Sequence, residues 1–215
     1  WTYDDRGRVT QQVNIISSSW FTTTWGYDPL DRVRTMTYPD NETVATSYNS
    51  QGLPRRLWGT NTYVKDSPAP VYDGLGRLTF LELGNGLQSR FTYNASTLRL
   101  DQIRTGTAPA TPGDRQNLTY SYDDTGNVTS IVNAKAGGTE TQAFTYDALN
   151  RLATAGASGG NGAPYSDAYT YDAGGRLTAV NANVYAYSDA NHPHAVTSAD
   201  GRSYVYDANG HMTAR

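Results

Sequence analysis

The chain has 215 residues, a formal net charge of −3 and no cysteine. No basic stripe is present, so the sequence gives no electrostatic footprint for nucleic acid, and without cysteine neither a disulfide nor a thiolate metal site can form. No run of about 18 apolar residues is found, so we expect no membrane insertion.

The composition predicts an ordered β protein with a thin core. Leu, Ile, Val and Phe are scarce, whereas 17 tyrosines and 4 tryptophans are present. Each large aromatic side chain can bury roughly 150–250 Å². Gly, Thr, Asn and Ser are abundant, and no apolar stripe repeats every 3.6 residues, so helices are not expected. The predicted fold class is therefore all-β.

In chain order, one motif recurs ten times, and each copy predicts a strand that ends at a tyrosine, a tight turn and a second strand. The stretch Tyr72–Phe80, "YDGLGRLTF", shows it clearly, and "LTFLELGNGLQSRFTYN" then predicts a hairpin around Asn85 and Gly86. A loose period of about twenty residues indicates a repeat architecture with loops of variable length. The ten tyrosines are Tyr3, Tyr27, Tyr48, Tyr72, Tyr93, Tyr122, Tyr146, Tyr171, Tyr187 and Tyr206.

The residues after the tyrosine have the chemistry of a tight turn. Asp follows it in most copies, and a carboxylate can accept hydrogen bonds from nearby backbone N–H groups. The fourth residue after the tyrosine is expected to adopt positive φ, which glycine does without penalty and which Asn and Asp tolerate best among the rest. This place holds Gly7, Gly52, Gly76, Gly126, Gly175 and Gly210, and in three further copies Asp31, Asn150 and Asn191.

An arginine and a second aromatic residue complete the motif. The aromatic residue stands two places before the tyrosine, and residues i and i+2 share one face of a strand. The tyrosines are expected to lock the hairpin ends, with the ring buried and the hydroxyl reaching water or a backbone group. The arginines are expected to bridge to a neighbouring Asp or to stack on aromatic rings. They are Arg8, Arg32, Arg77, Arg151 and Arg176.

These residues resemble a known repeat. The stretches "YDGLGRLTFLELGNG", "YDALNRL" and "YDAGGRLTAV" resemble the YD repeat of Rhs-type proteins, which include bacterial polymorphic toxins, the C components of insecticidal toxin complexes, and teneurins. The last stretch, "HPHAVTSADGRSYVYDANGHMTAR", looks like the repeats late in bacterial Rhs cores. The resemblance spans the whole chain. It implies β-hairpins joined edge to edge into a curved, spiralling sheet that forms a hollow shell, around a C-terminal toxin in bacterial members and as an adhesion body in teneurins.

For this chain the resemblance implies a structural role. We expect a single YD-repeat array over residues 1–215, about ten repeats long, as a fragment of a longer protein. It would be a shell or scaffold segment of a secreted or cell-surface bacterial Rhs-type protein that encapsulates or presents another domain. Its partners would be the rest of the parent chain, an enclosed toxin or effector domain, or other copies of itself.

Two copies depart from the family pattern. The copy at Tyr93 lacks both the glycine and the arginine, with Thr97 at the glycine place, and the copy at Tyr187 is distorted by the stretch His192–His194. The sequence contains no segment with the landmarks of toxin cleavage, so autoproteolysis is not predicted.

The residues that resemble catalytic or metal ligands have a simpler interpretation. His192, His194 and His211, with Asp189 or Asp200, are a candidate zinc set, yet they also fit as loop residues at the arginine place of the repeat. The paired carboxylates of the chain stand where turns demand Asp, which argues against a glycosidase pair. We therefore predict no enzyme activity, no catalytic residue, no metal site and no cofactor.

Two other functions stay open. An adhesin or carbohydrate-binding module would use exposed aromatic side chains to stack on sugars, and Trp20 and Trp58 are the candidate ligand contacts. A self-assembling tube or filament subunit would instead use open sheet edges to stack end to end.

Overall fold

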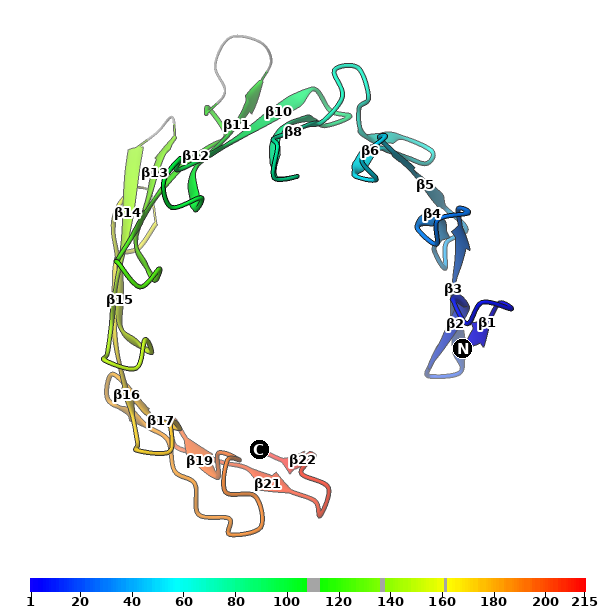
Figure 1. The fold of residues 1–215 in the computed structure, drawn as a ribbon. Coiled ribbons are helices and arrows are strands. Elements are labelled where there is room, and N and C mark those ends of the chain that lie inside the picture. Colours follow the sequence, from blue (N-terminus) through cyan, green and yellow to red (C-terminus); the bar gives the residue numbers. More distant parts are fainter. Residues whose placement is uncertain (108–112, 136–137, 161) are drawn as a thin grey trace. The chain divides into compact units, whose positions relative to one another are not determined.

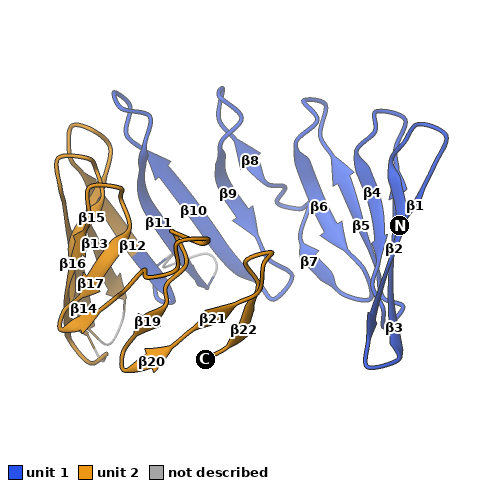
Figure 2. Cartoon of the chain, turned by 90° about the horizontal axis from the view of Figure 1, so that it is seen from below, with its two compact units in different colours: residues 1–117 blue, residues 118–215 orange. Residues whose placement is uncertain are grey.

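The computed structural model describes residues 1–107, 113–135, 138–160 and 162–215. Within these ranges the secondary structure consists of 22 β-strands and no helix, so the prediction of an all-β chain is confirmed (Figure 1). The described part of the chain accordingly offers no helix that could cross a bilayer. The chain divides into two compact units, residues 1–117 and residues 118–215 (Figure 2). A single array over residues 1–215 stays a prediction.

Unit 1 is built from two runs of consecutive hairpins, because within each run every strand pairs in antiparallel fashion with the strand next to it in the chain. The first seven strands form one sheet, β1 (Thr2–Tyr3), β2 (Val9–Ile16), β3 (Ser19–Tyr27), β4 (Val33–Thr37), β5 (Thr43–Tyr48), β6 (Pro54–Trp58) and β7 (Thr62–Val64). A second run contains β8 (Val71–Tyr72), β9 (Leu78–Glu82), β10 (Leu87–Tyr93) and β11 (Leu100–Thr107).

The two runs of unit 1 meet where β7 is bonded to the end of β9. A bridge pairs Val64 with Leu83, and the backbone N–H of Lys65 donates to the carbonyl of Glu82 at 2.9 Å. The Glu82 side chain accepts hydrogen bonds from Lys65 Nζ at 2.6 Å and Gln88 Nε2 at 2.8 Å. These bonds lower the pKa of Glu82, although the residue is only 8% exposed and burial alone would raise its pKa. The ion pair therefore supports the junction of the two runs.

The hairpin predicted around Asn85 and Gly86 is confirmed. Strands β9 and β10 pair with Gln88 opposite Glu82, and the backbone N–H of Leu83 donates to the carbonyl of Leu87 at 2.8 Å. Gly86 has φ +84°, which favours glycine at this turn.

Unit 2 repeats the same construction and ends in shorter pieces. Each of its first strands pairs with the next, and then two separate two-stranded hairpins follow. The strands are β12 (Gln116–Tyr122), which begins at the boundary, β13 (Val128–Lys135), β14 (Gly138–Tyr146), β15 (Leu152–Gly159), β16 (Tyr165–Tyr171), β17 (Leu177–Val180), β18 (Asn183–Val184), β19 (Ser198–Ala199), β20 (Arg202–Ser203), β21 (Val205–Tyr206) and β22 (Met212–Ala214).

The two faces of the strands differ. At the ends of β10, β12, β14 and β16, the tyrosine and the aromatic residue two places before it are half-buried, whereas the residue between them is exposed. On the exposed side, threonine hydroxyls pair across strands, with Thr145 to Thr154 at 2.6 Å and Thr170 to Thr178 at 2.9 Å. We call the first side the tyrosine face and the second the threonine face.

The core is thin. Among the described residues, the buried hydrophobic side chains are Phe80, Ala155 and Ala199. The chain of 23.4 kDa exposes 13497 Å², whereas a compact protein of that mass would expose roughly 9,700 Å². Most stability must therefore come from strand pairing and from contacts along the tyrosine face, which makes the repeated turn the site to examine.

Candidate functional site: the repeated tyrosine corner

The corner, defined as the tyrosine and the turn after it, is closed by one carboxylate. In the copy at Tyr72, the Oδ1 atom of Asp73 accepts the backbone N–H of Leu75 at 2.9 Å and that of Arg77 at 3.0 Å, while Oδ2 accepts Arg77 Nε at 2.7 Å. The N–H of Gly76 donates to the Asp73 carbonyl at 2.9 Å with φ +76°. The carboxylate thus satisfies two backbone donors and one guanidinium at once.

The same ion pair recurs in both units. Hydrogen bonds from the arginine lower the pKa of each aspartate, mainly through the guanidinium in most copies and mainly through the backbone N–H of Arg151 for Asp147. The Nε–Oδ2 distances are 2.7 Å for Arg8–Asp4, 2.7 Å for Arg32–Asp28, 2.7 Å for Arg151–Asp147 and 2.6 Å for Arg176–Asp172.

In eight copies the tyrosine hydroxyl joins a corner to the one before it. The Oη atom of Tyr27 donates to the carbonyl of Val9 at 2.7 Å, and Val9 follows the arginine of the preceding turn. A half-buried ring with a bonded hydroxyl explains why tyrosine and not phenylalanine stands here. The corresponding distances are 2.7 Å for Tyr48–Val33, 2.6 Å for Tyr72–Pro54, 3.0 Å for Tyr93–Leu78, 2.8 Å for Tyr146–Val128, 3.0 Å for Tyr171–Leu152, 2.8 Å for Tyr187–Leu177 and 2.9 Å for Tyr206–Val196.

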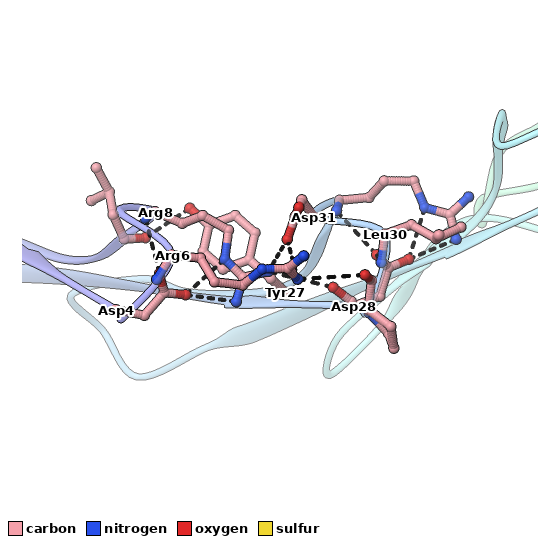
Figure 3. A network of polar contacts seen from close by, with 10 residues as sticks. Asp4, Arg6, Arg8, Tyr27, Asp28, Leu30 and Asp31 are labelled. Carbon is pink, nitrogen blue, oxygen red and sulfur yellow. Dashed lines mark hydrogen bonds and ion pairs between the residues drawn. The ribbon is translucent and has the colours of Figure 1, made fainter.

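The arginine makes the second link between corners. Figure 3 shows Arg8 beside its own Asp4 and near Tyr27, Asp28 and Asp31 of the next corner. Its Cζ atom lies 4.5 Å from the Tyr27 ring centroid, and its Nη1 lies 2.5 Å from Asp31 Oδ1. One guanidinium therefore closes its own turn, covers the next tyrosine ring and reaches the next turn. The same stacking occurs at 4.2 Å for Arg32–Tyr48, 4.2 Å for Arg77–Tyr93, 4.6 Å for Arg151–Tyr171 and 4.8 Å for Arg176–Tyr187.

Comparison with known families matches this geometry. Residues 3–43 match the RHS repeat model, and residues 113–214 match the teneurin YD-shell model. These two segments therefore carry repeats of the Rhs/YD type. Their corners are the YD repeats. No curated protein matches the chain.

Solved structures share the fold over nearly the whole YD-repeat chain. The TcdB2–TccC3 crystal structure matches with a TM-score of 0.72 and 18% identity, over 98% of this chain and 14% of that chain. The Photorhabdus luminescens Tc holotoxin pore matches with 0.71 and 19%, over 96% and 13%, and TcdB2–TccC3–Cdc42 with 0.71 and 19%, over 98% and 14%. The chain therefore spans about one seventh of the chains it resembles, and at this identity the likeness shows the fold alone.

Two YD repeats reach the same geometry with other residues, which the sequence did not indicate. The turn at Asn94 is one residue longer than expected, so Leu98, not Thr97, takes positive φ at +61°, and the turn closes with Asn94 N–H donating to the Arg99 carbonyl at 2.8 Å. An inserted residue hid this arginine from a fixed-spacing alignment. The prediction for the repeat at Tyr187 is wrong, because Asn191 does not adopt the positive φ predicted for it.

Asn127 stands at the arginine place in its repeat and makes a similar bridge. Its Nδ2 atom donates to Asp123 Oδ2 at 2.9 Å and to Asn150 Oδ1 of the next corner at 2.8 Å. The Asn127 side-chain bond to Asp123, together with the bonds from Thr125 and from the backbone of Asn127 and Gly126, lowers the pKa of Asp123 to about 2. An amide side chain can therefore replace the guanidinium in this bridge.

The histidines lie in the last two turns. His192 Nδ1 lies 2.8 Å from Asp189 Oδ2, and His211 Nδ1 lies 3.2 Å from Asp207 Oδ2. Over the described ranges, the fold brings no three His, Asp or Glu side chains together in a metal-binding group. The rings of His192 and His211 therefore stand at the position that holds arginine in other copies of the repeat.

The two candidate ligand contacts are not brought together. Trp20 lies at the start of β3 and is 70% exposed. Trp58 ends β6 and its ring is partly covered, with Arg56 Cζ at 4.8 Å and Arg34 Cζ at 5.7 Å from its centroid. A role of either in ligand binding stays a prediction.

Proposed function

We propose that the chain is a wall segment of a larger YD-repeat shell in a secreted or cell-surface protein, and that this shell encloses or presents another domain. The observation that carries the proposal is the double link between successive corners, made by the tyrosine hydroxyl and the bridging arginine. Because each link joins one hairpin to the next, the wall can be extended by further repeats without a thicker core.

The two faces support a wall. The described tyrosine face carries half-buried aromatic rings, and the threonine face carries paired hydroxyls. A sheet that is one side-chain layer thick suits a shell, in which a second domain or solvent occupies the enclosed side. The similar structures are complexes of TcdB2 with TccC3, which supports a toxin or effector domain as the partner in the parent protein.

The corner carboxylates are suited to structure and not to acid–base chemistry. Asp73 is surrounded by two backbone N–H donors and a guanidinium, and these bonds lower its pKa. It is ionised at neutral pH and its lone pairs are committed, so it has no proton to donate. The proposed role therefore requires no catalytic residue.

Protease protection in the parent protein tests the proposal. We expect the adjoining domain to resist proteinase K while the wild-type wall is folded, and to become cleavable in an Arg77→Gln, Tyr93→Phe double variant, which breaks both kinds of link. Leu75→Ser is the matched control, because Leu75 lies in the same turn and is 63% exposed. Cleavage of the adjoining domain in the folded wild-type protein as fast as in the free domain would contradict enclosure.

A further inference from the structure

The hairpin of β2 and β3 has an unusual composition. From Val9 to Tyr27 it contains 19 residues without a charge, although 17% of the whole chain is charged. Gln, Asn, Ser and Thr fill most of its length, and the large apolar residues gather at its tip. We define the apolar tip as Ile15, Ile16, Trp20 and Phe21, which are 60%, 62%, 70% and 40% exposed.

The register places apolar side chains on both faces of this tip. Ile15 lies directly opposite Trp20, so these two share one face. Phe21 is opposite Asn14, and Ile16 is two residues from Asn14 on the same strand, so Phe21 and Ile16 share the other face. The tip is therefore apolar all round, unlike a strand that packs one face on a core.

The tip extends past the neighbouring strand of unit 1. Strand β3 pairs with β4 only from Thr24 to Tyr27, which leaves Ser19–Thr23 without a partner on that side (Figure 2). Ser17 and Ser18 form the two-residue turn, with φ of 46° and 71°. The exposed end is thus a narrow two-stranded ribbon closed by hydroxyl-bearing residues.

The surroundings of Trp20 decide against a sugar. Aromatic rings that stack on sugars work with polar groups that bind the sugar hydroxyls, and here the residue opposite Trp20 on the same face is Ile15. Self-docking is also disfavoured by area. The four side chains expose roughly 400–500 Å², so two tips would bury about 1,000 Å², below the 1,200–2,000 Å² of stable interfaces.

A lipid surface fits the same features. It can surround both faces of a narrow ribbon without shape complementarity, and an uncharged ribbon has no ion to desolvate. Tryptophan favours the membrane interface, and the Gln, Asn, Ser and Thr residues behind the tip can bond to headgroups and water. We propose that the apolar tip inserts into the interface of a zwitterionic bilayer. This is a shallow contact and not a membrane span, and it goes beyond the expectation of no membrane insertion.

Flotation with phosphatidylcholine vesicles tests the proposal. We expect the chain to float with the vesicles, and we expect the bound fraction to stay constant between low and high salt because no charge is involved. Brominated acyl chains should quench tryptophan fluorescence of the bound chain. Absence of flotation, or flotation that requires anionic lipid and disappears at high salt, would overturn the proposal.

Variants locate the contact. Trp20→Ser, and separately Ile15→Ser with Ile16→Ser, should each weaken vesicle partitioning about tenfold or more, as expected for removal of a buried large side chain. Leu149→Ser is the matched control, because Leu149 is also 70% exposed but lies in a turn of unit 2, and it should leave partitioning unchanged. Equal effects at both places would overturn the proposal. So would Trp20-dependent self-association in the absence of lipid, which would assign the tip to a protein partner.

Discussion

Two regions of unit 2 pair a turn aspartate with different basic side chains, arginine in one and histidine in the other. In the corner at Tyr146, Arg151 Nε donates to Asp147 Oδ2 at 2.7 Å, and in the C-terminal region His192 Nδ1 lies 2.8 Å from Asp189 Oδ2. The arginine also stacks on the next tyrosine at 4.6 Å, whereas the His192 ring centroid lies 6.3 Å from that of Tyr206. The carboxylate and its partner close the turn in both regions, but only the arginine also covers the next ring closely.

The strands of the two regions also differ in length. Strands β12 to β16 have 7 to 9 residues, and β18 to β22 have 2 or 3. The backbone hydrogen bond of the turn is nevertheless the same. The Gly175 N–H donates to the Asp172 carbonyl at 3.0 Å, and the Gly210 N–H donates to the Asp207 carbonyl at 2.9 Å. The comparison shows that the turn forms from its own residues, and that the length of the neighbouring strands is determined by other residues.

Removal of a corner ring should have the largest effect. We expect Tyr171→Ala to lower the free energy of unfolding of unit 2 by about 2–3 kcal/mol, because the ring packs under Arg151 between long strands. Tyr206→Ala should cost about 1 kcal/mol or less, since its strands are short. Urea unfolding followed by circular dichroism measures both. Equal losses would show that the two regions are equivalent and contradict the comparison.

Backbone strain at the turn should have an intermediate effect in both regions. Gly175 has φ +85° with nothing within 4 Å of an added Cβ, so Gly175→Ala should cost about 1 kcal/mol through φ alone. Gly210→Ala, with φ +81°, should cost a similar amount. Gly174→Ala is the control, because Gly174 does not have positive φ. If thermal unfolding showed the same loss of stability for Gly174→Ala as for the other two variants, positive φ could not be the cause of the loss.

The response to pH should separate the regions with a smaller effect. The hydrogen bond with Asp189 raises the pKa of His192 above 6.5, with Asp207 adding to it, so the stability from this contact is complete below pH 6.5 and is lost as the pH rises through the raised pKa. The Asp147 contact is lost only below pH 3.8, because its hydrogen bonds with Arg151 lower the pKa of Asp147.

Hydrogen exchange between pH 6 and pH 8.5 measures this difference. Protection factors, which correct for the intrinsic rate, should fall across residues 185–215 and stay constant in β14–β16. His192→Arg should remove the pH dependence. A C-terminal region with constant protection across this range would argue against a titrating contact at His192.

The sequence predicted what depends on neighbouring residues. The tyrosine, Asp and glycine of a copy such as Tyr72–Arg77 lie within six residues, so turn chemistry and strand alternation could be read directly. The role of Leu98 could not, because one inserted residue shifts the turn and only strand pairing shows where positive φ falls. The Lys65–Glu82 contact depends on β7 bonding to β9, a choice that no local pattern encodes.

A double-mutant cycle on Arg151 and Tyr171 tests the central claim most directly, because these residues belong to successive corners and their stacking joins one hairpin to the next. Unfolding of Arg151→Gln, Tyr171→Leu and the double variant should give a favourable coupling energy of about 0.5–1 kcal/mol. The same cycle between Arg151 and Tyr206, which do not stack, should give none. A coupling of zero for Arg151 and Tyr171 would contradict the account that the corners hold the wall together.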